Sequence, residues 1–286
     1  MKLFERVQYF MARLMLGVLL GGLASVCLVQ WAPGFGVDER ELDPTLSDST
    51  RRRIRDQNKS VSFWKTYARQ VAHAVHGDFG VSSNFNAPVA DLIADRALIT
   101  AKSVAFGLAI AWGLAVPAAA MSVVWRGAAI PLMAAVSILL CIPLGLVAVY
   151  FFLLGFSATG VIAAGVIPKV FGYLRELLTE SAALPHVLAA AARGVHPWRI
   201  FWQHRFLAVA PETLSLAAVS INIALGAAIP AEALCDSPGL GQLAWKAATA
   251  RDLAPLLAVT WLLTTVTLAA NSLATVVSGT ERTWRP

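Results

Sequence analysis

Residues 186–241 read HVLAAAARGVHPWRIFWQHRFLAVAPETLSLAAVSINIALGAAIPAEALCDSPGLG, and this segment decides the fold. An alanine-rich helical run ends at Gly194, and Pro197 opens a second helix that is aromatic and basic. Glycine commonly follows the last turn of a helix, and proline is favoured in the first turn. An apolar span then runs from about Thr213 to Glu232. The pattern predicts an elbow between two helices. Its place between two membrane spans would let it contact a partner outside the membrane.

The composition of the whole chain places it in a membrane. Of its 286 residues, 57% are hydrophobic and 14% are charged, and the mean hydropathy is +0.65. Soluble proteins carry roughly 25% charged residues, so lipid must cover much of this surface. The net charge of +6 comes from residues scattered at the ends of apolar runs and in one loop. That scatter argues against nucleic acid as a partner and for the lipid bilayer.

Apolar runs long enough to cross a bilayer recur along the chain. They cover about residues 14–31, 100–124, 130–153, 158–178, 213–234 and 255–277. We therefore expect an all-α membrane protein with about six transmembrane helices. The short segments assigned to the inside hold ten lysine and arginine residues, whereas the short outer loops hold only Lys246 and Arg251. Long loops such as 32–99 are not counted by this rule, so both termini and the elbow are placed in the cytoplasm. The expected location is the cell inner (plasma) membrane, as a multi-pass protein.

The spacing of these runs predicts the domain organisation. Residues 1–31 form the N-terminus and first transmembrane helix, and residues 32–99 form an extracytoplasmic loop. Residues 100–277 form a five-helix core, which contains the cytoplasmic loop 179–211. A cytoplasmic tail completes the chain from residue 278 to residue 286.

Ionisable residues are nearly absent from the middle of the second, third and sixth runs, which disfavours an ion-coupled transporter. Lys169, near the middle of the fourth run, is an exception. A charge at the bilayer centre costs about 2.5–3.5 kcal/mol on insertion scales. Lys169 is therefore expected to reach toward the inner interface or to face protein, and a role in ion coupling stays open.

Motifs for catalysis or metal binding are missing from the sequence. There is no G-x-x-x-x-G-K-[ST] for nucleotide hydrolysis, and no His/Glu pair has zinc spacing. His73 and His76 offer two ligands without a third, and Cys27, Cys141 and Cys235 lack metal-ligand spacing. A Cys27–Cys235 disulfide stays open. We expect no catalytic residue, no metal and no cofactor, and thus a membrane subunit that draws its energy from elsewhere.

Short motifs distributed along nearly the whole chain carry a family resemblance. They are Ala32-Pro33-Gly34, Gly77-Asp78-Phe79-Gly80-x-Ser82, Pro88-Val89, Leu92-Ile93, Arg96, Thr100, Val116-Pro117, Arg175, Glu180, Ala190, Ala192-Arg193-Gly194, His204, Glu232, Pro238-Gly239-Leu240-Gly241 and Ala250-Arg251-Asp252. In order and spacing, they resemble the first of the two paired permease subunits of the dipeptide/oligopeptide/nickel ABC importers.

The resemblance implies a type I ABC importer permease fold and a complex with a second permease subunit, two ABC ATPase subunits and an extracytoplasmic solute-binding protein. The chain would form half of the translocation pathway for peptides, nickel or a related small solute. Its 186–211 loop would lie in a groove of the ATPase, which hydrolyses the ATP.

Two sets of site residues follow from the resemblance. The expected ATPase-coupling residues are Ala189, Ala190, Ala192, Arg193, Gly194, Pro197, Trp198, Phe201 and His204. The expected extracytoplasmic motif residues are Gly77, Asp78, Gly80, Pro88, Glu232, Pro238, Gly239, Gly241, Arg251 and Asp252. Phe201 and Trp202 would supply apolar contact area that is costly to leave bare.

Other interpretations stay open at this stage. A non-transporting membrane scaffold or regulatory relative of such permeases is one, because only residues 154–157 remain for the outer loop between the third and fourth runs. A secondary transporter or membrane enzyme is another, disfavoured by the lack of charges in most spans. Residues 197–206 also fit an amphipathic helix lying on the inner lipid surface.

Overall fold

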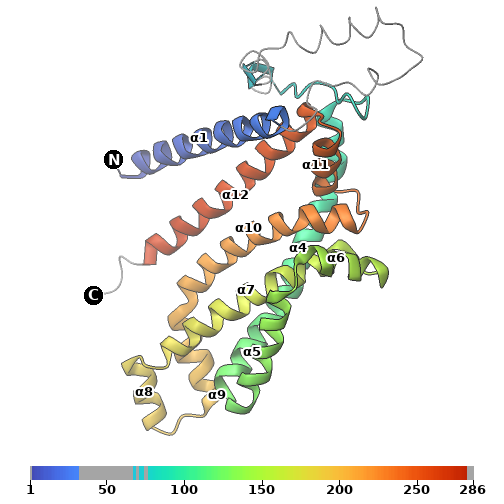
Figure 1. The fold of residues 1–286 in the computed structure, drawn as a ribbon. Coiled ribbons are helices and arrows are strands. Elements are labelled where there is room, and N and C mark those ends of the chain that lie inside the picture. Colours follow the sequence, from blue (N-terminus) through green and yellow to red (C-terminus); the bar gives the residue numbers. More distant parts are fainter. Residues whose placement is uncertain (1, 32–66, 69–70, 74–76, 282–286) are drawn as a thin grey trace, which may run out of the picture. The chain divides into compact units, whose positions relative to one another are not determined.

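The structure is a computed structural model that describes residues 2–31, 67–68, 71–73 and 77–281 (Figure 1). The described residues are almost entirely helical and contain no named strand; a single isolated bridge joins Val81 and Pro88. The Ala32-Pro33-Gly34 motif, His76 and most of the expected loop 32–99 lie outside the described residues. The expectation of an all-α fold is confirmed.

The helices follow one another along the chain with short connections. They are α1 (Lys2–Trp31), α4 (Val89–Val124), α5 (Arg126–Cys141), α6 (Leu144–Leu153), α7 (Ala158–Ser181), α8 (Pro185–Ala192), α9 (Pro197–Ile200), the π-helix η2 (Phe201–Phe206), the 3-10 turn η3 (Leu207–Val209), α10 (Ala210–Leu234), α11 (Leu240–Thr249) and α12 (Leu253–Glu281). They form two compact units: residues 1–96 with 243–265, and residues 97–242 with 266–286.

Length and hydropathy identify membrane-spanning helices among the described residues. Three helical segments qualify, Val89–Val124, Pro197–Leu234 and Leu253–Ser272, and the bent pair α5–α6 raises the number to four. Within α1 the apolar part is Leu14–Cys27. All six runs predicted to span are helical, although α7, with Lys169 and Arg175 in it, does not meet the hydropathy criterion.

The third predicted span differs from the expectation of one continuous helix over residues 130–153. It breaks between α5 and α6, whose axes are bent by 94°. Ile142 has extended backbone angles (φ −81°, ψ 123°), as expected for a residue before proline, and Pro143 has no N–H with which to continue the helix. The ten residues of α6 are therefore a separate helix.

The second unit packs around α7, which contacts α5, α6 and α10. Val166, Val170 and Leu174 of α7 are fully buried. Small residues of α10, Ala224 and Ala231 among them, are buried as well, and small side chains let helix backbones approach closely in membranes. This packing makes α7 the central helix of its unit.

The first unit joins α1 to the first part of α12. Val26, Leu257 and Trp261 form its buried cluster. The Tyr67 hydroxyl donates a hydrogen bond to the Leu19 carbonyl over 2.5 Å. Gly22 is required at its position, because a Cβ there would lie 2.2 Å from Nε1 of Trp261.

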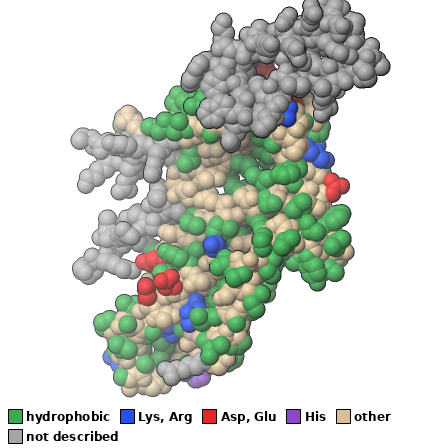
Figure 2. Space-filling model, viewed as in Figure 1, with side chains coloured by type: hydrophobic (Ala, Val, Ile, Leu, Met, Phe, Trp, Pro, Cys, Tyr) green, Lys and Arg blue, Asp and Glu red, His purple; other side chains and the backbone are tan. Residues whose placement is uncertain are grey.

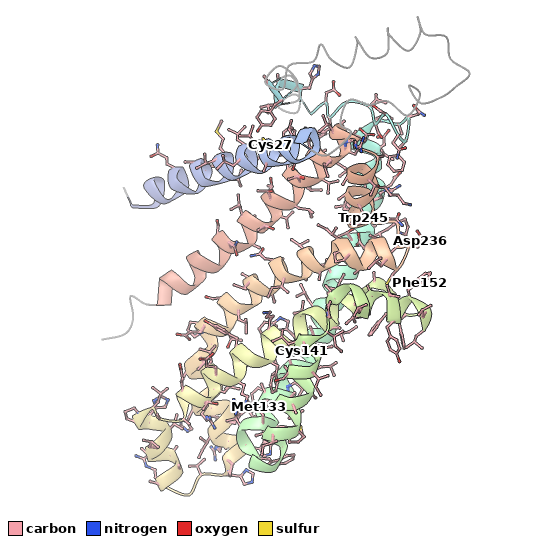
Figure 3. The ribbon with its side chains drawn as sticks, viewed as in Figure 1. Cys27, Met133, Cys141, Phe152, Asp236 and Trp245 are labelled. Atoms are coloured by element: carbon pink, nitrogen blue, oxygen red, sulfur yellow. The ribbon has the colours of Figure 1, made fainter. Side chains whose placement is uncertain are left out.

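Apolar side chains cover much of the described surface (Figure 2). Ile130 on α5 is 78% exposed and Leu153 on α6 is 74% exposed. Met133 and Phe152 are further exposed apolar side chains of α5 and α6 (Figure 3). So broad an apolar surface needs lipid or protein around it. All three cysteines are free thiols, so no Cys27–Cys235 disulfide is present.

Candidate functional site

The first arm of the elbow is α8, which starts at Pro185 and ends at Ala192. Gly194 follows with φ +73°, the left-handed conformation that glycine adopts without steric cost. Its N–H donates to the Ala191 carbonyl at 3.0 Å. The Val195 N–H donates to the Ala190 carbonyl at 3.3 Å. These two hydrogen bonds satisfy carbonyls in the last turn of α8, as in a glycine-terminated helix. The predicted helix, glycine turn and proline-started helix are confirmed.

The second arm begins at Pro197 and continues without interruption into α10, so the helical run extends over Pro197–Leu234. This differs from the expectation of a short helix followed by a separate span from Thr213. The π-helix η2 and the 3-10 turn η3 change the helical pitch but do not end the helix. Pro211 is the second residue of α10, which begins directly after η3. The elbow is therefore attached directly to a span.

The aromatic side chains of the second arm divide between the core and the surface. Phe201 is fully buried, with its ring centroid 6.0 Å from that of Trp198 and 5.0 Å from that of Trp202. Trp202 itself is 48% exposed. The sequence assigned both Phe201 and Trp202 to a contact surface. In the structure Phe201 anchors the arm internally, and Trp202 is the exposed aromatic group.

Arg205 ties the second arm to the end of α7. Its guanidinium donates to the Leu178 carbonyl and, at 3.4 Å, to the Ser181 hydroxyl. A cation at a helix C-terminus satisfies carbonyls and interacts favourably with the helix dipole. The sequence did not single out this role, because the partners lie 24 and 27 positions earlier. A basic residue near a predicted helix end was the only available signal.

The remaining elbow residues lie mainly on the surface. Ala189, Ala192 and Arg193 are exposed, and Ala190 is buried. His204 is half-buried beside His186: Nε2 of His186 lies 3.2 Å from the His204 carbonyl. The elbow thus has a packed inner side and an exposed outer side.

In the same unit, a buried carboxylate organises the Pro238–Gly241 motif. Glu232 is fully buried, and its Oε2 accepts hydrogen bonds from Thr100 Oγ1 at 3.0 Å and the Gly241 N–H at 2.7 Å. Thr100 in turn accepts from the Leu240 N–H at 2.7 Å. A Cβ on Gly239 would lie 2.2 Å from Oε2 of Glu232. Glu232, Thr100 and the glycines therefore form one cluster joining α4, α10 and α11.

In the first unit, a second buried carboxylate joins the Gly77–Ser82 motif to the Ala250–Asp252 motif. Asp252 Oδ2 accepts from the Ser82 hydroxyl at 2.6 Å and from the Asn84 N–H at 3.0 Å. The Ser82 oxygen accepts from the Phe85 N–H at 3.0 Å. Arg251, next to Asp252, is exposed and has φ +56°. Pro88 closes the loop through its bridge with Val81.

Asp252→Ala is expected to destabilise the loop that contains Ser82 by about 1–3 kcal/mol, because a buried hydroxyl and an N–H lose their acceptor. Asp252→Asn keeps an acceptor oxygen and is expected to cost less. The melting temperature and the rate of proteolytic cleavage in the loop measure the effects of both substitutions. Asp91→Ala, at an exposed position on α4, is the control. Equal behaviour of Asp252→Ala and wild type would contradict this role.

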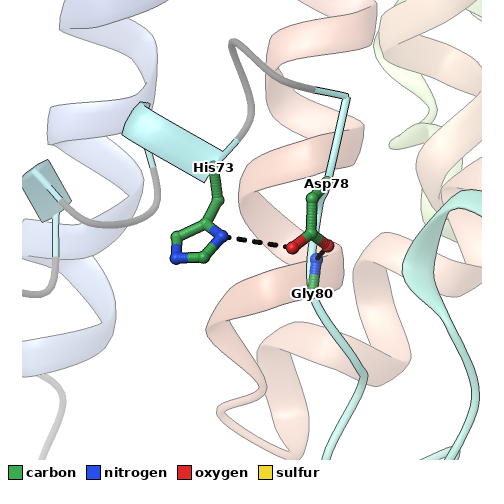
Figure 4. Close-up of polar contacts among 3 residues, drawn as sticks. All are labelled: His73, Asp78 and Gly80. Atoms are coloured by element: carbon green, nitrogen blue, oxygen red, sulfur yellow. Dashed lines mark hydrogen bonds and ion pairs between the residues drawn. The ribbon is translucent and has the colours of Figure 1, made fainter.

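Asp78 forms an exposed cluster in the Gly77–Gly80 turn (Figure 4). Its Oδ1 accepts from the Gly80 N–H at 2.9 Å, and Nδ1 of His73 lies 3.1 Å from its Oδ2. Both contacts favour the ionised carboxylate, so they lower the pKa of Asp78, the Gly80 bond contributing most. Gly77 and Gly80 have φ of +77°, which the turn requires.

The lowered pKa of Asp78 predicts a pH dependence of this turn. A carboxylate with a lowered folded-state pKa contributes stability above its unfolded value, about 3.9, and loses it as pH falls through the folded value. Protection of the Gly80 amide from hydrogen exchange is expected to fall in that acid range. Asp78→Ala should lose the protection at every pH, whereas Asp95→Ala should behave as wild type. Pronounced loss of protection near neutral pH in wild type would contradict the assignment.

Across the described residues, no group of three or more His, Cys, Asp or Glu side chains could hold a metal ion. The arrangement instead offers a rigid elbow and two clusters built on buried carboxylates. The chain matches the family described as binding-protein-dependent transport system inner membrane component over residues 103–280, more than half of its length. It belongs to that family. The comparison with curated proteins finds no match to this chain.

Membership gives the chain a class. It is a permease of the ABC importer type, an inner membrane component of a binding-protein-dependent transport system. Its long apolar helices agree with a membrane location.

Proposed function

We propose that this chain forms half of the translocation pathway of an ATP-driven importer and couples to a separate ATPase through residues 186–211. One observation carries the proposal. The elbow is fixed internally by Phe201 and Arg205, and it presents Trp202 outward. A fixed loop with an exposed tryptophan is suited to transmit motion from a partner, because it moves with α7 and α10 together.

The complex would contain a second permease subunit, two ABC ATPase subunits and an extracytoplasmic solute-binding protein. Its solute would be a peptide, nickel or a related small solute. Residues 32–99 would lie outside the cytoplasm, residues 100–277 would form the five-helix core, and both termini, with the tail 278–286, would lie in the cytoplasm. The chain itself would be non-catalytic, with ATP hydrolysed on the partner.

Co-purification of the tagged chain with its ATPase tests the coupling role. Trp202→Ser is expected to weaken the complex by about tenfold or more, since tryptophans often contribute 2 kcal/mol or more to an interface. Trp245→Ser is the matched control: Trp245 is 55% exposed but belongs to the other unit. Equal capture of the ATPase by wild type and Trp202→Ser would contradict the proposal.

A non-transporting scaffold is the second candidate. It is favoured by the short connection between α6 and α7, residues 154–157, which leaves little surface for a binding protein. Reconstituted vesicles separate the two candidates. ATP-driven solute uptake supports the importer, and a stable complex that hydrolyses ATP without uptake supports the scaffold.

A further inference from the structure

One side of α7 changes character half-way along the helix. In the first half this side is covered by neighbouring helices. A Cβ on Gly107 of α4 would lie 2.9 Å from Cγ2 of Ile162, and a Cβ on Gly165 would lie 3.2 Å from Cδ1 of Leu144 on α6. From Lys169 onward the same side is exposed. Lys169 is therefore the first exposed residue after the covered half.

The exposed residues that follow share this side of the helix. Lys169, Gly172, Tyr173 and Glu176 are spaced at i, i+3, i+4 and i+7, which places them on one face. Tyr173 is 51% exposed, and a Cβ on Gly172 would meet no atom within 4 Å. The opposite face of α7 is buried, as Val170, Leu174 and Leu178 show.

The chemistry of this face does not suit lipid. It carries an ammonium, a phenol and a carboxylate, and α7 is not among the helices apolar enough to qualify as spans. Ionisable side chains within membrane helices generally face protein or a water-filled space. Lys169 lies about 16 Å along α7 from Ala158 at 1.5 Å per residue, which is near half of a hydrocarbon core of about 30 Å.

The surroundings of the Lys169 ammonium group matter for its role. Within the part of the chain that the structure describes, no carboxylate forms an ion pair with its ammonium group. Glu176 lies two helical turns further along, at about 10 Å. An ammonium group attracts an anion, and low-dielectric walls around a water-filled cleft strengthen that attraction. Carboxylates are compact acceptors for its three N–H donors.

We propose that Lys169 lines the water-filled solute path and binds a carboxylate group of the transported solute. This inference rests on the proposed importer function and narrows its solute class. A fixed positive charge favours an organic acid or a peptide with a free C-terminus, and it repels a free divalent cation. Lys169 would thus select against bare nickel ions.

Thiol labelling of the assembled transport complex tests the position and the field of Lys169 without any added solute. Tyr173→Cys, in a full chain with Cys27, Cys141 and Cys235 changed to alanine, is treated in membrane vesicles with an anionic and a cationic methanethiosulfonate reagent. Tyr173→Cys should react with both, and faster with the anionic one. Adding Lys169→Met should lower the anionic-to-cationic rate ratio about threefold or more, the sign expected for a near charge.

Ile130→Cys, on the exposed apolar side of α5, is the lipid-facing control and should react with neither reagent. An unreactive Tyr173→Cys would overturn the proposal, because the face would not be aqueous. An unchanged rate ratio with Lys169→Met would overturn it as well, because Lys169 would not set the local field.

Uptake by the complete importer tests the ligand class, with dialanine and its C-terminal amide as probes. Lys169→Met should reduce dialanine uptake about tenfold and leave amide uptake unchanged, and Lys169→Arg should retain dialanine uptake. An equal loss of both probes in Lys169→Met would overturn carboxylate binding. If the wild-type importer transports neither probe, peptide import fails as a function, and the labelling ratio still decides the role of Lys169.

Discussion

Replacing Gly194 with valine is expected to reduce ATP-driven uptake by about tenfold or more. Gly194 has φ +73°, and a left-handed conformation costs an ordinary L-residue about 1–2 kcal/mol, most for a β-branched one. A Cβ at this position would meet no atom within 4 Å, so the effect is one of backbone conformation alone. The elbow would populate other geometries, and the arms beginning at Pro185 and Pro197 would lose their fixed relation.

The substitution series separates conformation from side-chain size. Gly194→Asn should retain most of the uptake, because asparagine tolerates the left-handed region. Gly127→Val, on α5, also meets open space but does not have a positive φ, and it should have little effect on coupling. Uptake in vesicles and co-purification with the ATPase are measured for each variant. Equal activity of Gly194→Val and Gly194→Asn would show that the turn conformation is unimportant.

Gly239→Ala is expected to destabilise the protein by about 2–4 kcal/mol through Glu232. The new Cβ would lie 2.2 Å from Oε2 of that side chain, and the carboxylate can move only by giving up Thr100 and the Gly241 N–H. Leaving a buried hydrogen-bonding group without its partner costs about 1–3 kcal/mol. In a Glu232→Ala background, Gly239→Ala should cost little, giving a coupling energy of about 2 kcal/mol.

Gly241→Ala is the comparison variant for this double-mutant cycle of Gly239→Ala and Glu232→Ala. Its Cβ would lie 2.7 Å from both the Ala228 carbonyl oxygen and the Ile229 Cα, which are backbone atoms that cannot move aside. It should therefore remain destabilising when Glu232 is alanine. Thermal unfolding followed by tryptophan fluorescence measures all the variants, since the chain has nine tryptophans. Additive effects of Glu232→Ala and Gly239→Ala would contradict the cluster.

The positions of helices and turns could be predicted because they depend on local chemistry. Gly194 and Pro197 act on their own backbone, so the elbow follows from the residues themselves. The break in the helix at Pro143 could not be predicted in this way, since proline occurs both within membrane helices and at their ends. Pro117 remains inside α4, whereas Pro143 separates α5 from α6. Packing around each proline decides between these outcomes, and packing is not local.

The contacts within the candidate sites could not be predicted for the same reason. Glu232 and Thr100 are 132 positions apart, and Ser82 and Asp252 are 170 positions apart. Each residue was recognisable as part of a motif, but no spacing rule indicates which motifs meet. The polar and aromatic neighbours of Phe201 predict a surface position for it. In the structure Phe201 is the first residue of the π-helix η2 and is fully buried, and the sequence contains no simple signal for a π-helix at this place.

The 94° bend between α5 and α6 changes the direction of any displacement that this helix pair carries. When α5 shifts along its own axis, α6 moves almost entirely broadside, because the two axes are nearly perpendicular. Since α6 contacts α7 and α10, such a movement would slide it across both helices. Pro143 helps to keep the two helices from joining into one straight helix, because it lacks the N–H that would continue the hydrogen-bond pattern.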